Sequence, residues 1–173
     1  MSQLFLLVLM ALVCAIQQSS LKFTVPAGWV EEERTSSMRV AQYRLPKAAG
    51  DTEDASLILY YFGQGQGGST TANVERWIGQ IQLADGSSSK DKAKQENLEV
   101  NGLKVATVDV SGTYVAETAP GSGTLLNKPG YRLRAAVVET PKGSYFVKLV
   151  GPEKTVTHWN DSFLSYLQSF EFK

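Results

Sequence analysis

The stretch ENLEVNGLKVATVDVSGTYV, residues 96–115, carries the strongest local signal for a fold. Asn101-Gly102 separates two strand-like runs, and this pair favours a two-residue hairpin turn in which both backbone φ angles are positive. A second stretch, YRLRAAVVETPKGSYFVKLVG at residues 131–151, predicts another hairpin that turns at Pro141-Lys142-Gly143. Strands joined by hairpins pair antiparallel, so we expect a mostly antiparallel sheet.

Residue spacing on either side of these hairpins indicates further strands and two helices. The predicted elements are strands over 21–25, 38–46 and 55–63, a helix whose apolar stripe is Val74, Trp77, Ile78 and Ile81, a C-terminal helix over 156–170 and a short extended tail. Residues 38–46 alternate apolar and polar, as in a half-buried strand, whereas residues 55–63 are apolar on both faces, as in a covered central strand. Thr70 or Thr71 can cap the first helix, and Thr155 or Thr157 the second.

The order of these elements predicts the fold class α+β. Helices added to the faces of a mostly antiparallel sheet would form an α/β/α sandwich, because each apolar face must be buried against another element. The chain has 173 residues, and we expect residues 16–173 to form one domain with its own hydrophobic core.

The first fifteen residues predict a signal peptide. Residues 4–15, LFLLVLMALVCA, are shorter than the roughly 20 apolar residues that a membrane-spanning helix needs. Val13 and Ala15 supply small residues where a signal peptidase cleaves, which places the protein outside the cytoplasm, secreted or periplasmic. The preceding residues contain no Lys or Arg, so either the natural start lies upstream or the free amino terminus is the only positive charge before the apolar run. Anchoring as a lipoprotein through Cys14 is the less favoured alternative, because Val13 fits the lipid-attachment signal poorly.

Composition excludes several classes of chemistry. Seventeen basic and seventeen acidic residues balance, which gives no electrostatic reason to expect nucleic acid as a partner. Cleavage after Ala15 would leave no cysteine, and His158 is the single histidine, so we expect no disulfide, no thiolate nucleophile, no metal and no cofactor. Asp51, Glu53 and Asp54 lack the spacing of a calcium-binding loop.

A glycine-rich loop precedes the first helix. Gly63, Gly65 and Gly68 match GxGxxG, but the following strand begins a hairpin instead of a parallel unit, and Ser69 stands where a P-loop has its lysine. The loop is therefore expected to be a connector. A weaker alternative is an anion site, because a helix N-terminus offers free N–H groups. That site would comprise Gly65, Gly67, Gly68, Ser69 and Thr70.

Four basic residues occupy polar alternates of the predicted strands, namely Arg44, Arg132, Arg134 and Lys148. If these strands are neighbours, the four cations share one face of the sheet and could bind a small anionic ligand or an acidic partner. The alternative is that carboxylates of adjacent strands, such as Glu139, neutralise them.

His158, with Asp161 three residues later, is the candidate for catalysis. A triad needs three positioned partners, and neither a GxSxG motif nor any other pattern identifies a serine. We therefore assign no catalytic residue, and a hydrolase that uses His158 and Asp161 remains the alternative to a non-catalytic protein.

The chain resembles a group of small exported bacterial proteins of uncharacterised function in four motifs: Phe23-x-x-Pro26-x-x-Trp29, MRVAQYRLP at 38–46, YYFGQGQGGSTTANVERW at 60–77 and YFVKLVGPEKTV at 145–156. More distantly, the first motif and the strand–helix order that follows it resemble the PsbP-type fold, an antiparallel sheet between helices. PsbP proteins are extrinsic subunits of photosystem II. The resemblance implies the fold and no activity.

Together these observations predict an exported, non-catalytic binding or accessory module. We expect an unknown protein or a small anionic ligand of the cell envelope as its partner. Loops on a rigid sheet commonly carry function, so the expected binding site is an opening between the glycine-rich loop and the loop over residues 116–130.

Overall fold

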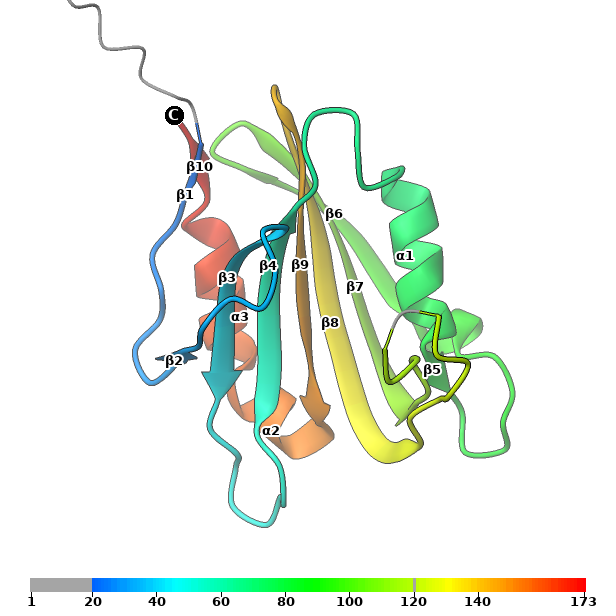
Figure 1. Ribbon diagram of the computed structural model, residues 1–173. Helices are drawn as coiled ribbons and strands as arrows, with labels where there is room; N and C mark the ends of the chain where they lie inside the picture. Colours follow the sequence, from blue (N-terminus) through cyan, green and yellow to red (C-terminus); the bar gives the residue numbers. More distant parts are fainter. Residues whose placement is uncertain (1–19, 120) are drawn as a thin grey trace, which may run out of the picture.

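The structure is a computed structural model that describes residues 20–119 and 121–173 (Figure 1). The predicted signal peptide, residues 1–15, lies outside the described residues. The strands are β1 (Leu21–Lys22), β2 (Val30–Glu31), β3 (Arg39–Leu45), β4 (Ala55–Tyr61), β5 (Ile81–Gln82), β6 (Lys94–Val100), β7 (Leu103–Tyr114), β8 (Lys128–Thr140), β9 (Gly143–Pro152) and β10 (Glu171–Phe172). The helices are α1 (Thr70–Gly79), α2 (Glu153–His158) and α3 (Asn160–Gln168), with a 3-10 turn at Lys90–Lys92.

The described strands form one large sheet and one short pair. The large sheet has the order β2-β3-β4-β9-β8-β7-β5, with β6 also paired to β7. Neighbouring strands are antiparallel throughout, and β1 pairs with β10 near the two ends of the described chain. The predicted α+β fold with a mostly antiparallel sheet is confirmed.

Both predicted hairpins form, but one turn is shorter than expected. Val100 lies opposite Leu103 across Asn101 and Gly102, whose φ angles are +49° and +78°, as the Asn-Gly pair predicts. In the β8–β9 hairpin Thr140 lies opposite Gly143, so the turn contains only Pro141 and Lys142. This difference of one residue decides which face of the sheet each side chain of β9 occupies.

Two groups of buried side chains lie on opposite faces of the sheet. Along β8, Ala136 and Val138 belong to one cluster while Ala135 and Val137 belong to the other, as the alternation of a strand requires. The first cluster contains Phe163, Tyr166, Leu167 and Phe170 from α3 and the segment after it, together with Trp29. The second contains Val74, Trp77 and Ile78 from α1. Each large side chain removed from water stabilises the fold by about 1.5–3 kcal/mol.

The helices cover the sheet unequally. α1 contacts β5, β7 and β8, at the end of the sheet far from β3 (Figure 1). On the α1 face, Ile58 and Tyr60 of β4 and Lys148 of β9 are only partly buried. β4 is therefore buried on the α2–α3 face and only partly buried on the α1 face. The predicted α/β/α sandwich is not confirmed.

Several element boundaries also differ from the expectation. α2 begins at Glu153, so neither Thr155 nor Thr157 caps it, and the strand expected over 55–63 ends at Tyr61. Ser69, not Thr70 or Thr71, caps α1, because its Oγ accepts a hydrogen bond from the N–H of Ala72 at 3.1 Å. The C-terminal helix is divided into α2 and α3 at Trp159, whose indole N–H donates to the carbonyl of Pro46 at 2.9 Å. The predicted strand over 21–25 is reduced to Leu21–Lys22.

Candidate functional site

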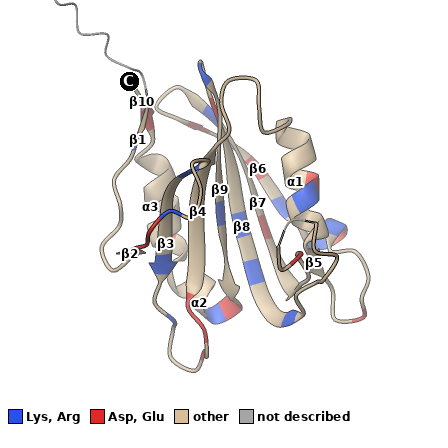
Figure 2. Ribbon diagram, in the orientation of Figure 1, with Lys and Arg blue, Asp and Glu red and all other residues tan. Residues whose placement is uncertain are grey.

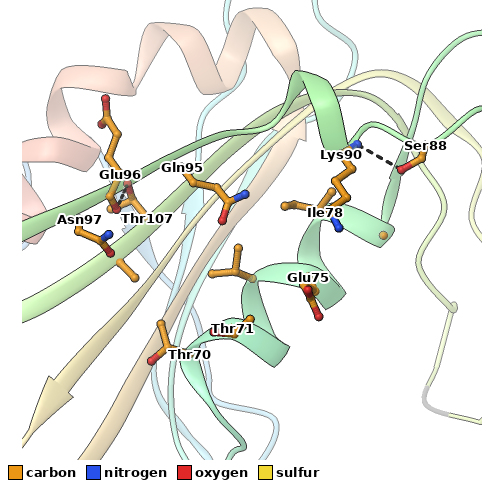
Figure 3. A pocket seen from close by; sticks show the side chains of 13 residues that line it. Thr70, Thr71, Glu75, Ile78, Ser88, Lys90, Gln95, Glu96, Asn97 and Thr107 are labelled. Carbon is orange, nitrogen blue, oxygen red and sulfur yellow. Dashed lines mark hydrogen bonds between the residues drawn. The ribbon is translucent and has the colours of Figure 1, made fainter.

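A cavity lies between α1 and the β6–β7 hairpin, and we call it the α1 groove (Figure 3). Its volume is about 580 Å³. It is lined by Thr70, Thr71, Val74, Glu75, Ile78 and Gly79 of α1, by Ser88, Lys90, Gln95, Glu96 and Asn97, and by Ala106 and Thr107 of β7. A cavity of this size is in the range that binds small molecules.

The α1 groove combines an apolar floor with hydrogen-bonding walls. Val74 and Ile78 are buried, while Thr71, Gln95 and Asn97 present hydroxyl and amide groups that both donate and accept. Figure 3 shows Glu75 on α1 and Lys90 on the segment that follows β5, and both side chains are exposed. The lining also contains Glu96, whose carboxylate lies 2.8 Å from Nζ of Lys94, so this charge is already paired. The opposite charges of Glu75 and Lys90 then leave the groove close to neutral.

The glycine-rich loop serves as a close-packed connector. Gly67 has a φ of +89°, and a Cβ at this position would lie 2.6 Å from Cε2 of Phe146, so only glycine fits. The buried side chain of Asn73 donates to the carbonyls of Gly67 and Ser69 at 2.8 and 2.9 Å. These contacts hold the loop against the start of α1.

A carboxylate already lies beside the N-terminus of α1. Thr70 Oγ1 donates to Glu139 Oε1 at 2.9 Å. A negative charge near a helix N-terminus is favourable, and it would repel a second anion bound to the same loop. Anion binding at Gly65, Gly67, Gly68, Ser69 and Thr70 stays a prediction, and Glu139 is its competitor. Thr70 itself lines the α1 groove.

The predicted opening between the glycine-rich loop and the loop over 116–130 is wrong. The glycine-rich loop packs on Gly143, where a Cβ would lie 3.0 Å from Cα of Gln64, beside the end of β8 at Thr140. The other loop joins Tyr114 to Lys128, which lie opposite each other at the start of β8. The two loops are therefore at opposite ends of the thirteen-residue strand β8.

The expectation that four basic residues share one face is also wrong. Arg134 lies opposite Leu149, and Arg132 opposite Gly151, which puts both arginines on the α2–α3 face. Lys148 lies opposite Ala135 and Ile58, on the α1 face. Arg44 shares the α1 face with Lys148, because it lies opposite Ser56, two residues from Ile58.

Three of these four cations have a carboxylate partner, and two of them share one. Asp109 accepts two hydrogen bonds from Arg132, at 2.8 and 2.6 Å, and its Oδ2 lies 3.4 Å from Nε of Arg134. This arrangement raises the pKa of Arg132, whereas burial lowers the pKa of Arg134. Arg44 lies 2.9 Å from Asp54 and 3.7 Å from Glu32, and its hydrogen bond lowers the pKa of Asp54. The expected pairing with carboxylates is therefore found for these three, with partners other than Glu139, and the two arginines share a single carboxylate.

Lys148 lines a second, smaller cavity, which we call the Lys148 pocket. It lies between α1 and the strands β4 and β9, with a volume of about 330 Å³, and is lined by Tyr60, Phe62, Arg76, Trp77, Gln80, Phe146 and Lys148. Lys148 Nζ donates to Gln80 Oε1 at 2.6 Å and to the hydroxyl of Tyr114 at 2.9 Å. Burial and, secondarily, the charge of Arg76 lower the pKa of Lys148 to about 8. The sequence pattern identified Lys148 but not Arg76 or Gln80, because these come from the polar side of a helix almost seventy residues away.

His158 and Asp161 are not assembled for catalysis. Both side chains are exposed, and no hydrogen bond joins them in the described part of the chain. The His158 ring contacts Trp159 edge-on at 4.9 Å between ring centroids, and Asp161 accepts from the amide of Asn160 at 3.1 Å. Across residues 20–119 and 121–173 no group of three His, Cys, Asp or Glu side chains is arranged to hold a metal ion. None of the described helices combines the length and apolar character of a membrane span.

No family model matches the chain, and no curated protein sequence matches it. Among solved structures it is similar to LpqN, a protein involved in cell envelope biogenesis of Mycobacterium tuberculosis, with a TM-score of 0.55 and 9% identity over 90% of this chain and 84% of LpqN. It is also similar to cyanobacterial PsbP (CyanoP) from Synechocystis sp. PCC 6803, with a TM-score of 0.53 and 13% identity over 90% of this chain and 92% of CyanoP. The predicted distant resemblance to the PsbP-type fold is confirmed. At these identities the likeness concerns the fold alone.

Proposed function

We propose that this protein is an exported, non-catalytic binding or accessory module of the cell envelope, and that its ligand binds in the α1 groove. The observation that carries the proposal is the groove itself, about 580 Å³ in volume, with an apolar floor and walls of hydroxyl and amide groups. These groups suit recognition by shape and hydrogen bonding. The groove contains neither His158 nor an activated nucleophile, which favours binding over turnover.

The near neutrality of the α1 groove narrows the class of ligand. Glu75 and Lys90 carry opposite charges on its rim, and Glu96 is paired with Lys94, so a strongly charged ligand would be attracted by one rim charge and repelled by the other. Thr71, Gln95 and Asn97 offer both donors and acceptors, which match hydroxyl or amide groups of a polar molecule. We therefore expect a small polar ligand with little net charge in this groove.

Export is supported by the apolar run at residues 4–15 and by the fold that the chain shares with LpqN, which is involved in envelope biogenesis. Expression of the full chain in a bacterial host, followed by mass spectrometry of the purified protein, tests it directly. We expect a mature N-terminus at Ile16 in the extracytoplasmic fraction. An uncleaved chain confined to the cytoplasm would contradict the export part of the proposal.

Binding in the α1 groove is tested with two tryptophan substitutions on the same helix. Thr71 lines the groove and is exposed, so Thr71→Trp should fill it without disturbing the core. Ala72 is exposed and is not part of the groove lining, so Ala72→Trp is the matched control. The wild type and the control, incubated with an envelope extract and repurified, should retain a small molecule by mass spectrometry that Thr71→Trp lacks. Equal retention by all three proteins would overturn the proposed site.

The alternative hydrolase makes a different prediction. Turnover of ester or amide substrates that depends on His158 should disappear in His158→Ala. The side chains of His158 and Asp161 are exposed and not hydrogen-bonded to each other, so we expect the wild type and His158→Ala to show the same absence of turnover. If the wild type showed turnover and His158→Ala did not, the hydrolase hypothesis would be favoured over the binding module.

A further inference from the structure

The Lys148 pocket brings two cations together without a carboxylate. Lys148 donates to an amide oxygen and to a hydroxyl, and Arg76 donates to Oδ1 of Asn73 at 2.6 Å, so the recorded partners of both are neutral. Among the described residues no Asp or Glu oxygen lies within 4.0 Å of Lys148 Nζ. Figure 2 shows a basic position on β9 and no acidic one, and β4 is likewise without acidic residues.

Two neighbouring cations without a carboxylate partner are electrostatically unfavourable, and a bound anion would relieve this cost. A partly buried ammonium loses hydration, and its two neutral partners replace only part of that loss. Burial is accordingly the main cause of the lowered pKa of Lys148, and the charge of Arg76 is the second. The ammonium has three N–H donors, and the hydrogen bonds to Gln80 and Tyr114 occupy two of them. One donor is left for a ligand.

The remaining walls of the Lys148 pocket are aromatic. The rings of Tyr60 and Phe62 are stacked, with centroids 5.8 Å apart and an interplanar angle of 7°. Phe62 also contacts Phe146 at 5.5 Å between centroids, and Trp77 of α1 forms the facing wall. Aromatic faces bury flat apolar groups effectively and add little conformational entropy loss. The volume of about 330 Å³ is at the small end of ligand sites.

We propose that the Lys148 pocket binds a small organic acid, whose carboxylate accepts hydrogen bonds from Lys148 and Arg76 and whose flat apolar part lies against the aromatic walls. The pocket is on the opposite flank of α1 from the α1 groove. The proposal therefore goes beyond the proposed function and does not depend on it. The sequence predicts a small anionic ligand, and this pocket is where we expect it to bind. Of its two cations, the sequence predicts Lys148 but not Arg76.

The test uses 2-naphthoate as the probe, with two comparison ligands measured on the wild-type protein by isothermal titration calorimetry. The neutral 2-naphthamide keeps the flat body and removes the charge, and acetate keeps the carboxylate and removes the body. We expect 2-naphthoate to bind with a Kd below about 1 mM, and each comparison ligand to bind at least about tenfold more weakly. Equal binding of 2-naphthoate and 2-naphthamide, or no binding of 2-naphthoate, would overturn the proposal.

Substitutions locate the binding. Lys148→Met keeps the length of the side chain and removes the charge, and it should weaken 2-naphthoate at least about tenfold while leaving 2-naphthamide unchanged. Lys104→Met, at an exposed lysine on β7 outside the pocket, is the matched control and should bind like the wild type. Arg76→Gln, at an exposed position of α1, provides a second variant whose folding does not depend on core packing, and it should also weaken 2-naphthoate. Unchanged affinity in both Lys148→Met and Arg76→Gln would place the site elsewhere.

Discussion

Lys148 and the pair Arg132–Arg134 lie on neighbouring strands and differ in what surrounds them. The two arginines share Asp109, which accepts two hydrogen bonds from Arg132 and lies 3.4 Å from Nε of Arg134. Asn160 accepts a further hydrogen bond from Arg134. Lys148, on the opposite face, has an amide, a hydroxyl and the ring of Tyr114 at 5.0 Å. The arginine pair has a carboxylate partner, although Nε of Arg134 is buried without a hydrogen bond, whereas Lys148 has no carboxylate partner among the described residues.

The register of the sheet explains the difference. Arg134 lies directly opposite Asp109 on β7 and Leu149 on β9, so its row across the sheet contains a carboxylate. Lys148 lies opposite Ile58 on β4 and Ala135 on β8, so its row contains none. Directly opposite residues are the closest side-chain neighbours in an antiparallel sheet. A cation with no carboxylate directly opposite it on the neighbouring strands is therefore available to bind an anionic ligand.

Asp109→Asn should have the largest effect on stability. The side chains of Arg134 and Arg132 are only 8% and 18% exposed, so the substitution leaves two cations poorly solvated and without their carboxylate. Removal of one member of such a cluster costs about 3 kcal/mol in free energy of unfolding. Urea unfolding followed by tryptophan fluorescence measures it.

Asp91→Asn is the control for Asp109→Asn. Asp91 is exposed and forms no salt bridge or side-chain hydrogen bond with a described residue, so its substitution should leave the unfolding midpoint unchanged. Similar effects of the two substitutions would show that the arginine pair does not need Asp109, and the contrast with Lys148 would then be lost.

The length of the β8–β9 turn determines which face of the sheet Lys148 occupies, and the sequence pattern does not predict that length. A turn over Pro141-Lys142-Gly143 would place Thr140 opposite Ser144 and bring Lys148 to the face of Arg132 and Arg134. The actual turn has two residues, and Gly143 pairs with Thr140. A slip of one residue moves a whole strand's side chains to the other face. The predicted alternation is therefore correct within each strand, but the prediction that the basic residues of different strands share one face is wrong.

Local signals predicted the elements better than the site. The Asn101-Gly102 turn, the antiparallel hairpins and the stripe from Val74 to Ile78 depend on a few adjacent residues, and the structure confirms them. The Lys148 pocket requires the side of α1 that carries Arg76 to face β9, which is set by packing between distant segments. No spacing in the sequence encodes that contact.

The next largest effect should be a pH-dependent contribution of Lys148. Its pKa is about 8 in the folded protein and 10.5 in the unfolded chain, so the unfolded chain binds more protons between these values. Wild-type stability should consequently gain about 2 kcal/mol from this residue as the pH rises from 7 to 10, and Lys148→Met should lack this gain.

Comparison of two variants isolates the contribution of Lys148. Tyr60 lines the pocket and Tyr114 accepts a hydrogen bond from Lys148, but the pKa values of both hydroxyls are raised, that of Tyr114 to about 12, so they do not titrate in this range. Lys142→Met, at an exposed lysine of the β8–β9 turn, should follow the wild-type pH profile. Parallel profiles for the wild type and Lys148→Met would mean that Lys148 is as well compensated as the arginine pair.

The smallest effect on stability is expected for Arg44→Gln. Arg44 lies on the same face of the sheet as Lys148, but unlike Lys148 it has carboxylate partners. Arg44 is 43% exposed and its partners, Asp54 and Glu32, are 30% and 37% exposed, so solvent screens their interaction. Its loss should lower the thermal midpoint by no more than about 2 °C, and about 1 M salt should remove the difference. The effect of Asp109→Asn should persist in the same salt, because screening weakens exposed pairs far more than buried ones. Scanning calorimetry at both ionic strengths distinguishes the two cases. If the lower thermal midpoint of Arg44→Gln persisted in high salt, the difference in burial would not explain why Arg44 and the arginine pair behave differently. The neighbouring side chains in each row of the sheet would then be the remaining explanation.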